Sequence, residues 1–219
     1  GPGEITAIIG STGSGKSTLV NLILRFYDVD SGKIKIDGVD IREISLEQLR
    51  SKIGFVPQKT VLFSGTIKDN LRFGNEEATE EEIRHGAQIA QALDFIEGFE
   101  EGLEHKISQG GTNLSGGQKQ RLAIARALIR KCEIYIFDDS FSALDFKTDA
   151  RLRQALRKET KEATVIIVGQ RVSSIMDANR IIVLDQGRIA GLGTHRELLK
   201  TCEVYREIVF SQLSEEESA

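Results

Sequence analysis

A glycine-rich segment near the start of the chain constrains the fold more than any other feature. An apolar run at Ile5–Ile9 leads into residues 10–17, which read Gly-Ser-Thr-Gly-Ser-Gly-Lys-Ser, and residues 19–26 follow with helical composition. This order fits the pattern G-x-x-x-x-G-K-[ST], in which glycines let backbone N–H groups turn toward phosphates at the start of a helix. The residues expected to bind the phosphates of a nucleotide are Gly10, Ser11, Thr12, Gly13, Ser14, Gly15, Lys16, Ser17 and Thr18.

Three side chains have distinct expected tasks at this phosphate-binding loop. Lys16 is placed to reach the β- and γ-phosphates, and the hydroxyl of Ser17 to hold Mg²⁺. The apolar run at 134–137 ends in Asp138, where a carboxylate that helps to hold the same Mg²⁺ belongs. The loop alone leaves kinases, GTPases, helicases and transporter ATPases open.

The rest of the chain alternates strand-like and helical segments. Further strands are expected at 33–41 (a hairpin turning at Asp37-Gly38), 53–56, 134–137, 164–168, 180–184 and, after a turn at Gln186-Gly187, 189–192. Helices are expected at 80–98, after Ser115 to about 130, at 147–160 and at 195–213. The alternation predicts an α/β fold whose mainly parallel sheet is covered on both faces, with an antiparallel β edge.

The order of these segments also suggests an internal division. We expect a core at about 1–75 and 131–200, a helical subdomain at about 76–130, and a C-terminal helix at about 195–213. Residues 214–219 are expected to form a solvated, frayed tail.

Composition excludes several classes of protein. The chain has 219 residues and a net charge of 29 − 33 = −4, so a nucleic-acid partner is not expected. No apolar run reaches the roughly 18 residues of a membrane span, and no charged-then-apolar leader is seen, so neither a membrane span nor secretion is expected. Cys132 and Cys202 lack metal-site spacing and are expected to be inert packing residues. His85, His105 and His195 are likewise expected to be surface or loop residues.

A further motif, at residues 114–118, narrows the choice among these classes of nucleotide-binding protein. The segment Leu114-Ser115-Gly116-Gly117-Gln118 resembles the signature of ATP-binding cassette (ABC) ATPases. Gln58 is similar to the Q-loop glutamine of that family, and Ser142-Ala143-Leu144-Asp145 to its D-loop. The resemblance covers nearly the whole chain, and residues 55–67 are closest to the exporter branch of the family.

This resemblance implies a P-loop ATPase with a RecA-like core that works as one half of a head-to-tail dimer. Two such domains enclose two ATP molecules, and each signature serves the partner's site. Ser115, Gly116 and Gly117 would therefore contact a γ-phosphate bound to the other domain. Gln58 would contact Mg²⁺ and couple the nucleotide state to transmembrane domains, which places the chain at the cytoplasmic face of the cell membrane.

Two positions depart from the family pattern. Asp139 stands where the family has the glutamate that acts as general base, and Gln170 stands where it has a histidine. With Lys16, these are the residues expected to take part in hydrolysis. The aspartate is shorter by one methylene, about 1.5 Å, whereas general-base catalysis needs hydrogen-bond distance to the water. The glutamine cannot become cationic.

The two departures resemble the degenerate half of a heterodimeric ABC exporter. The resemblance then implies slow hydrolysis at this chain's own site, and a different partner chain with an intact glutamate and histidine. No aromatic residue precedes Gly10, so the adenine-stacking strand of the family, like its membrane domain, is expected to be absent from an excised ATPase domain. Two alternatives are a soluble ABC protein that acts as a nucleotide-dependent interaction module, and a P-loop nucleotide kinase.

Overall fold

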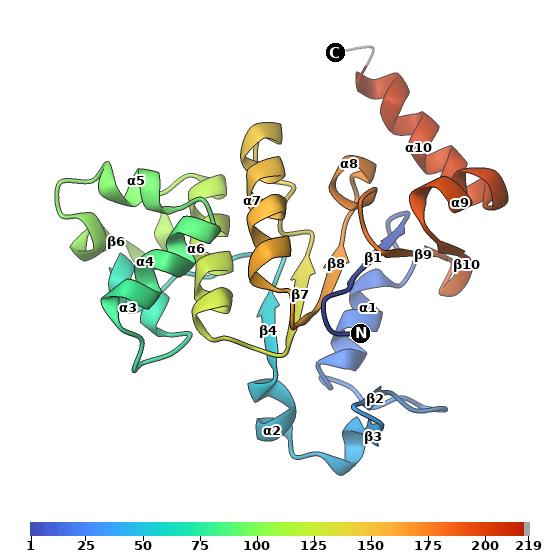
Figure 1. Ribbon diagram of the computed structural model, residues 1–219, viewed down its shortest axis with the longest axis horizontal. Helices are drawn as coiled ribbons and strands as arrows, with labels where there is room; N and C mark the ends of the chain where they lie inside the picture. Colours follow the sequence, from blue (N-terminus) through green and yellow to red (C-terminus); the bar gives the residue numbers. More distant parts are fainter. Residues whose placement is uncertain (217–219) are drawn as a thin grey trace.

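The computed structural model describes residues 1–216 and is built around a six-stranded sheet (Figure 1). The strand order is β10-β9-β1-β8-β7-β4, with five parallel strands and β10 antiparallel to β9 at one edge. The strands are β1 (Ile5–Gly10), β4 (Ile53–Val56), β7 (Ile134–Asp138), β8 (Thr164–Val168), β9 (Arg180–Asp185) and β10 (Arg188–Gly193). The predicted α/β class and the antiparallel edge are therefore confirmed.

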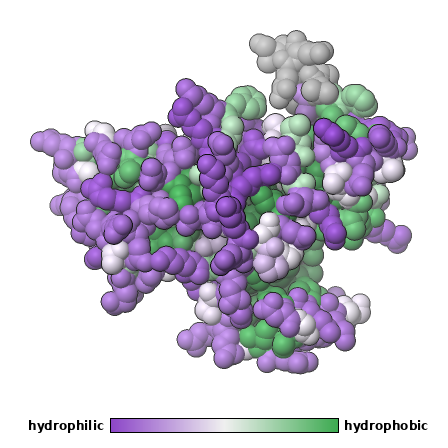
Figure 2. All heavy atoms as spheres, in the orientation of Figure 1, coloured by the Kyte–Doolittle hydropathy of each residue, from purple (hydrophilic) through white to green (hydrophobic). Residues whose placement is uncertain are grey.

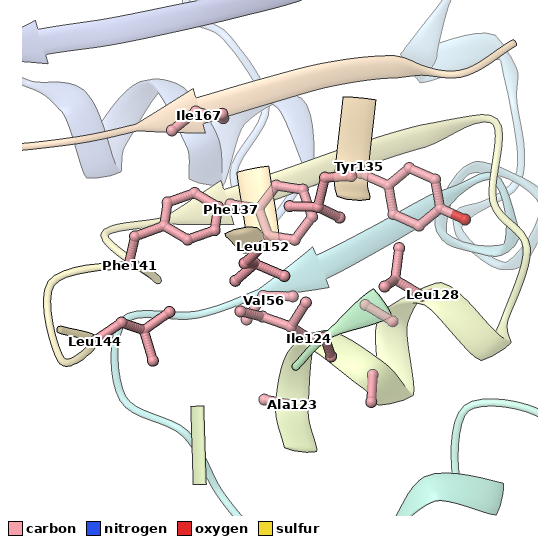
Figure 3. Close-up of a cluster of buried hydrophobic side chains, with 14 of the residues drawn as sticks. Val56, Ala123, Ile124, Leu128, Tyr135, Phe137, Phe141, Leu144, Leu152 and Ile167 are labelled. Carbon is pink, nitrogen blue, oxygen red and sulfur yellow. The ribbon is translucent and has the colours of Figure 1, made fainter. Parts of the chain in front are cut away.

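The sheet is apolar on both faces because its central strands are buried on both sides. On β7, Ile136 joins a cluster with Val20 of α1 (Lys16–Ile23) and Leu49 of α2 (Leu46–Ser51). Its neighbours Tyr135 and Phe137 point to the other face. Figure 3 shows the second cluster, in which aromatic rings of β7 lie between the sheet and α6 (Gly116–Ile129).

The predicted hairpin is present as β2 (Lys35–Ile36) and β3 (Val39–Asp40), which pair apart from the main sheet. Asp37 and Gly38 occupy the turn with φ of 51° and 82°. Two consecutive residues with positive φ are typical of a type I′ turn, whose twist matches that of the paired strands. Residues Ile41–Glu43 continue as the 3₁₀ helix η1.

The segment from 65 to 130 forms a mostly helical lobe beside the sheet, on the left in Figure 1. It contains α3 (Ile67–Arg72), α4 (Glu80–Ile89), α5 (Leu93–Glu97), η2 (Gly102–Glu104), η3 (Gln109–Gly111) and α6. A short antiparallel pair, β5 (Gly65–Thr66) with β6 (Lys106–Ile107), joins the start of the lobe to the segment that precedes α6. The pair has only two residues in each strand, too few to show a period in the sequence.

The segment 80–98, expected to be helical, forms two helices with a break between them. Helix α4 ends at Ile89, and Gln91 takes a left-handed conformation with φ of 57° before α5 begins at Leu93. The N–H of Ala92 donates to the carbonyl of Ala87 across this break. Residues 90–92 read Ala-Gln-Ala, which gives no signal of a helix end because all three favour helix.

The expected C-terminal helix at 195–213 also consists of two helices, α9 (His195–Thr201) and α10 (Glu203–Glu216). Cys202 separates them in an extended conformation. The first helix ends at Ile23, not at residue 26, and Arg25 follows with φ of 51°. The helix expected at 147–160 is present as α7 (Phe146–Glu159), and the short α8 (Val172–Ile175) was not predicted.

Helix α10 continues to Glu216, so the expected frayed tail at 214–219 is wrong over its first residues, and 217–219 lie outside the described part of the chain. No helix within residues 1–216 combines the length and the apolar composition needed to cross a bilayer. Hydrophilic side chains cover most of the face seen in Figure 2, with apolar ones gathered near β2–β3 and beside β10, where Ile189 and Leu192 are exposed.

A buried asparagine joins α3 to the loop before it and to α6. Asn70 on α3 is only 2% exposed, and its Nδ2 donates to the carbonyls of Phe63 (2.9 Å) and Thr66 (3.0 Å). Its Oδ1 accepts from the N–H of Phe63 (2.9 Å) and from Nη2 of Arg126 (3.3 Å) on α6. The amide thus holds the loop before α3 against the helix that leads back to the sheet.

We expect Asn70→Ala to lower the free energy of unfolding by about 1–3 kcal/mol, because it leaves buried polar partners without a hydrogen bond. Urea denaturation measures this change. Gln88→Ala, at an exposed position on α4, is the matched control and should change stability by less than about 0.5 kcal/mol. Equal effects of the two substitutions would contradict this role of Asn70.

Candidate functional site

The phosphate-binding loop connects the central strand β1 to α1. Gly15 caps α1 in a left-handed conformation, with φ of 103°, a geometry that L side chains rarely adopt. At Gly10 a Cβ would lie 2.2 Å from the carbonyl oxygen of Leu184 and 2.5 Å from Oγ of Ser14. Glycine is therefore required at both ends of the loop, and the predicted succession of strand, loop and helix is confirmed.

Lys16 folds back over this loop. Its Nζ donates to the carbonyl oxygens of Gly10 (2.7 Å) and Ser11 (2.8 Å). Burial lowers the pKa of the ammonium group, while the nearby carboxylates of Asp139 and Asp138 act in the opposite direction. The lysine thus holds a positive charge at the loop, with loop carbonyls as its partners.

The register of the parallel strands brings the other predicted residues to the same edge of the sheet. Val56 pairs with Phe137, Phe137 with Ile167, and Ile167 with Ala7. The four strands therefore end side by side at one edge of the sheet, and the loop after each strand begins within a few residues of these paired positions. The loops after β1, β4, β7 and β8 contain the predicted site residues, which lie far apart in the sequence.

Asp139 lies at the centre of this edge. Its Oδ2 accepts hydrogen bonds from Nε2 of Gln58 (2.9 Å) and from Nε2 of Gln170 (3.1 Å). Its backbone carbonyl accepts from Oγ of Ser142 (3.0 Å), the first residue of the predicted D-loop. The structure thus brings together four residues that the sequence motifs indicate separately, namely Gln58, Asp139, Ser142 and Gln170.

The conformation and charge of Asp139 are both unusual. Its φ is 46°, in the left-handed region, where aspartate is enriched among residues other than glycine. Burial raises the pKa of its carboxyl group, against the lowering effect of the hydrogen bonds from Gln58 and Ser142. Burial and the adjacent charge of Asp139 also raise the pKa of Asp138, with Lys16 acting in the opposite direction.

Ser17, Asp138 and Gln58 supply a hydroxyl, a carboxylate and an amide oxygen near the loop. Oxygen ligands of this kind, few in number and completed by substrate phosphates, suit Mg²⁺. The amide of Gln58 donates through its nitrogen to Asp139, which leaves its oxygen available as a ligand. The donor set therefore fits the metal ion expected from the sequence.

The segment Leu114–Gln118 lies at the start of α6, away from the phosphate-binding loop (Figure 1). Ser115 caps the helix, since its Oγ accepts from the N–H of Gln118 (3.2 Å) while Oε1 of Gln118 accepts from the N–H of Ser115 (2.9 Å). Within residues 1–216 no hydrogen bond joins this segment to Lys16 or Asp139. The segment thus presents a capped helix start that lies outside the chain's own phosphate site.

The D-loop packs directly beneath this helix start. A Cβ on Gly117 would lie 3.2 Å from the carbonyl oxygen of Ala143 and 3.7 Å from a side-chain carbon of Leu144. Asp145 caps α7, because its Oδ1 accepts from the N–H of Thr148 (2.9 Å). Ser142–Asp145 therefore connects Asp139 on one side to the signature-like segment on the other.

The histidines take no part in this edge. His85 lies exposed on α4 beside the carboxylate of Glu159, and the ring of His105 stacks on Phe99 at 3.8 Å. His195, expected at the surface or in a loop, is half-buried at the start of α9, where its Nδ1 lies 2.8 Å from the hydroxyl of Tyr205. The two cysteines, Cys132 and Cys202, are buried and unpaired, as expected for packing residues.

Two residues with structural roles in this region could not be identified from the sequence. Ser140 is fully buried, and its Oγ donates to the carbonyl of Val56 (2.9 Å), which joins the loop after β7 to the end of β4. Gln212 on α10 bonds to the backbone on both sides of Arg171. Neither residue forms part of a sequence motif, because both act through contacts between segments far apart in the chain.

Comparison with known proteins gives consistent results at three levels. The family model described as "ABC transporter" matches residues 1–142. An uncharacterised ABC transporter ATP-binding protein of Mycobacterium tuberculosis is 52% identical over 214 residues, which cover 96% of this chain and 36% of that protein. An ATP-dependent lipid A-core flippase of Chromobacterium violaceum is 44% identical, over 98% of this chain and 37% of the flippase.

A solved structure agrees with the fold. The structure of a bacterial Atm1-family ABC exporter with ATP bound superimposes with a TM-score of 0.94 at 40% identity, over 96% of this chain and 37% of the exporter chain. This likeness confirms the P-loop α/β fold. The chain spans between 36% and 37% of the length of these three relatives.

The raised pKa of Asp138 leads to a prediction about stability. Between the ordinary pKa of aspartate and the raised value, the folded chain binds more protons than the unfolded chain, so its stability falls as pH rises through that window. We therefore expect Asp138→Asn to stabilise the ligand-free chain at pH 7, with a benefit that shrinks as the pH falls through the raised pKa toward the ordinary pKa of aspartate. Thermal unfolding at several pH values measures this change.

Asp149→Asn is the control, because Asp149 is also buried but is paired with Arg153. This substitution should destabilise the chain at pH 7. An Asp138→Asn variant that is less stable than wild type at pH 7 would contradict the electrostatic description of the site.

Proposed function

The chain belongs to the ABC transporter family, and on this premise we propose that it binds and hydrolyses ATP as the nucleotide-binding domain of an exporter. The observation that carries the proposal is the sheet edge at which the phosphate-binding loop, the adjacent acids Asp138 and Asp139, Gln58 and Gln170 meet. The family and the ATP-bound exporter supply the substrate.

The loop from Gly10 to Thr18 would bind the phosphates through backbone N–H groups and the positive end of α1. Lys16 would exchange its carbonyl partners for the β- and γ-phosphates. Ser17, Asp138 and Gln58 would hold Mg²⁺, which neutralises phosphate charge when it is bound. Asp139 and Gln170 would face the γ-phosphate and the attacking water.

We propose that the signature segment Leu114–Gln118 serves a second ABC domain. Its glycines open α6, so its N–H groups and helix dipole are suited to bind a phosphate. Because no hydrogen bond in the described part of the chain links it to the chain's own loop, a head-to-tail dimer gives it a partner. The segment Ser142–Asp145 packs against Gly117 and would couple the nucleotide state of one site to that of the other.

The transmembrane domains of an exporter would dock beside the helical lobe, on the cytoplasmic face of the membrane. Phe63 and Phe73 are 46% and 66% exposed, with their ring centroids 4.8 Å apart, and the guanidinium of Arg126 lies over both rings. An exposed apolar cluster of this kind is typical of an interaction site. It also favours an exporter over a soluble ABC protein, which has no membrane domain to dock.

We further propose that this chain's own site hydrolyses ATP slowly, as the degenerate half of a heterodimer. The carboxylate of Asp139 is about 1.5 Å short of a glutamate's reach, and a general base must come within hydrogen-bond distance of the water. Its Oδ2 is also bound by two amides, those of Gln58 and Gln170. The raised pKa of Asp139 favours proton acceptance but does not restore the missing reach.

Lys16 provides a test of ATP binding. Lys16→Ala should weaken MgATP binding by at least about tenfold, because it removes a charge-assisted contact to the phosphates. Isothermal titration of the chain with MgATP measures the dissociation constant. Lys158→Ala, at an exposed position on α7, is the control and should bind as wild type does. Unchanged affinity in Lys16→Ala would overturn the nucleotide site.

Asp139 and Gln170 provide a test of slow hydrolysis at this site. In the assembled pair, with the partner's general base replaced by glutamine so that only this site reports, Asp139→Glu or Gln170→His alone should raise turnover little. Together they should raise it by more than the product of the single gains, because the two groups act in one transition state. Steady-state ATP turnover of the four variants measures this coupling. A wild-type site that already turns over at about 1–10 s⁻¹, an ordinary enzyme rate, would overturn the slow-site proposal.

A further inference from the structure

The C-terminal helix α10 reaches the loop that contains Gln170. Oε1 of Gln212 accepts a hydrogen bond from the N–H of Val172 at 2.8 Å. Nε2 of the same side chain donates to the carbonyl oxygen of Gln170 at 2.5 Å. One amide therefore binds the backbone on both sides of Arg171. Its oxygen serves as the acceptor in one contact and its nitrogen as the donor in the other, so both atoms of the amide are needed.

This amide completes a helix start that lacks a cap of its own. Helix α8 begins at Val172, and the residue before it, Arg171, gives no side-chain hydrogen bond to the helix. The first N–H groups of a helix have no partner within it and need one from elsewhere. Gln212, 40 residues further along the chain, supplies that partner to Val172.

Helix α10 is anchored well enough to hold Gln212 in place. Tyr205 and Val209 are buried, and their spacing with Gln212 (205, 209 and 212) puts all three on one helical face. The hydroxyl of Tyr205 lies 2.8 Å from Nδ1 of His195 on α9, which ties the helix to the element before it. Gln212 is thus a polar group on the packed face of α10.

The contact continues into the nucleotide site. Gln170, whose carbonyl Gln212 binds, donates its side-chain amide to Asp139 at 3.1 Å. The same carboxylate oxygen accepts from Gln58. Fixing the backbone of Gln170 therefore fixes the direction of a side chain that points at the proposed catalytic carboxylate.

We propose that Gln212 is a positioning residue, which sets the backbone of the Gln170 loop so that the Gln170 amide faces Asp139 and the γ-phosphate. This inference rests on the proposed function, in which Gln170 contacts the γ-phosphate. ATP and ADP differ by that phosphate alone. Gln212 should therefore affect the preference for ATP over ADP without affecting ADP affinity.

The test is the ratio of the ADP and ATP dissociation constants in the presence of Mg²⁺, measured by titration of the full chain. Gln212→Ala should lower this ratio by about two- to tenfold, the effect of one hydrogen bond, and leave ADP affinity unchanged. Gln212→Glu should lower the ratio at least as much, because a carboxylate keeps the acceptor for Val172 but faces the Gln170 carbonyl without a donor. Glu207→Gln, at an exposed position on the same helix, should keep the wild-type ratio.

A double-mutant cycle separates positioning from general stability. Gln170→Ala should lower the ratio by itself, and the double variant Gln170→Ala/Gln212→Ala should lower it no further, since Gln212 acts through Gln170. Amide hydrogen exchange should show faster exchange at Val172 in Gln212→Ala than in wild type. A loss of ADP affinity equal to the loss of ATP affinity would assign Gln212 a purely structural role and overturn the inference.

The inference and the proposed function fail in different ways. If Gln170→Ala lowers the ratio but the Gln212 variants do not, the inference is wrong and the role of Gln170 stands. If Gln170→Ala leaves the ratio unchanged, the γ-phosphate contact of Gln170 is wrong, and the inference falls with it. If wild type binds neither nucleotide, the nucleotide site itself is wrong.

Discussion

The backbone register of the parallel sheet determines which side chains can meet. Hydrogen bonds pair Val56 with Phe137 and Phe137 with Ile167, and through them align the ends of three strands with the end of β1. A change of one residue in this register would turn each strand's side chains to the opposite face. It would also separate Asp139 from Gln58 and Gln170, whose amides share one carboxylate oxygen. Backbone pairing between the strands therefore determines which side chains of the site lie within reach of one another.

The sequence predicts those parts of the fold that depend on local patterns. The strands are predictable because β-branched and apolar runs end at Gly10 and Asp138. The phosphate-binding loop was found because its glycines have a local steric task. Features set by tertiary contacts could not be predicted. They are the left-handed Gln91, the buried Asn70 and the hydrogen bonds of Gln212 to the backbone beside Arg171. The roles proposed for Asp139 and Gln170 rest on the family resemblance, while the hydrogen bond between their side chains is seen in the structure.

The ligand-free site is electrostatically unfavourable in a way that suits binding. Burial raises the pKa of both adjacent acids, and the charge of Asp139 raises that of Asp138 further, while the nearby Lys16 is bound to carbonyl oxygens of its own loop. Such groups lower the stability of the folded state until a ligand satisfies them. A ligand that brings both anionic phosphates and a divalent cation would relieve the acids and the lysine together, so binding would stabilise the fold as well as occupy the site.

The position of β1 in the sheet has a consequence for how the chain folds. β1 lies between β8 and β9, yet these neighbours follow it in the chain by more than 150 residues. During synthesis the phosphate-binding strand therefore leaves the ribosome long before either of its hydrogen-bonding partners exists. Long-range parallel pairing of this kind is slow to form, and an unpaired apolar strand is prone to aggregate. Ile5–Gly10 is thus open to aggregation during synthesis, and a translational pause before β8 would prolong its exposure.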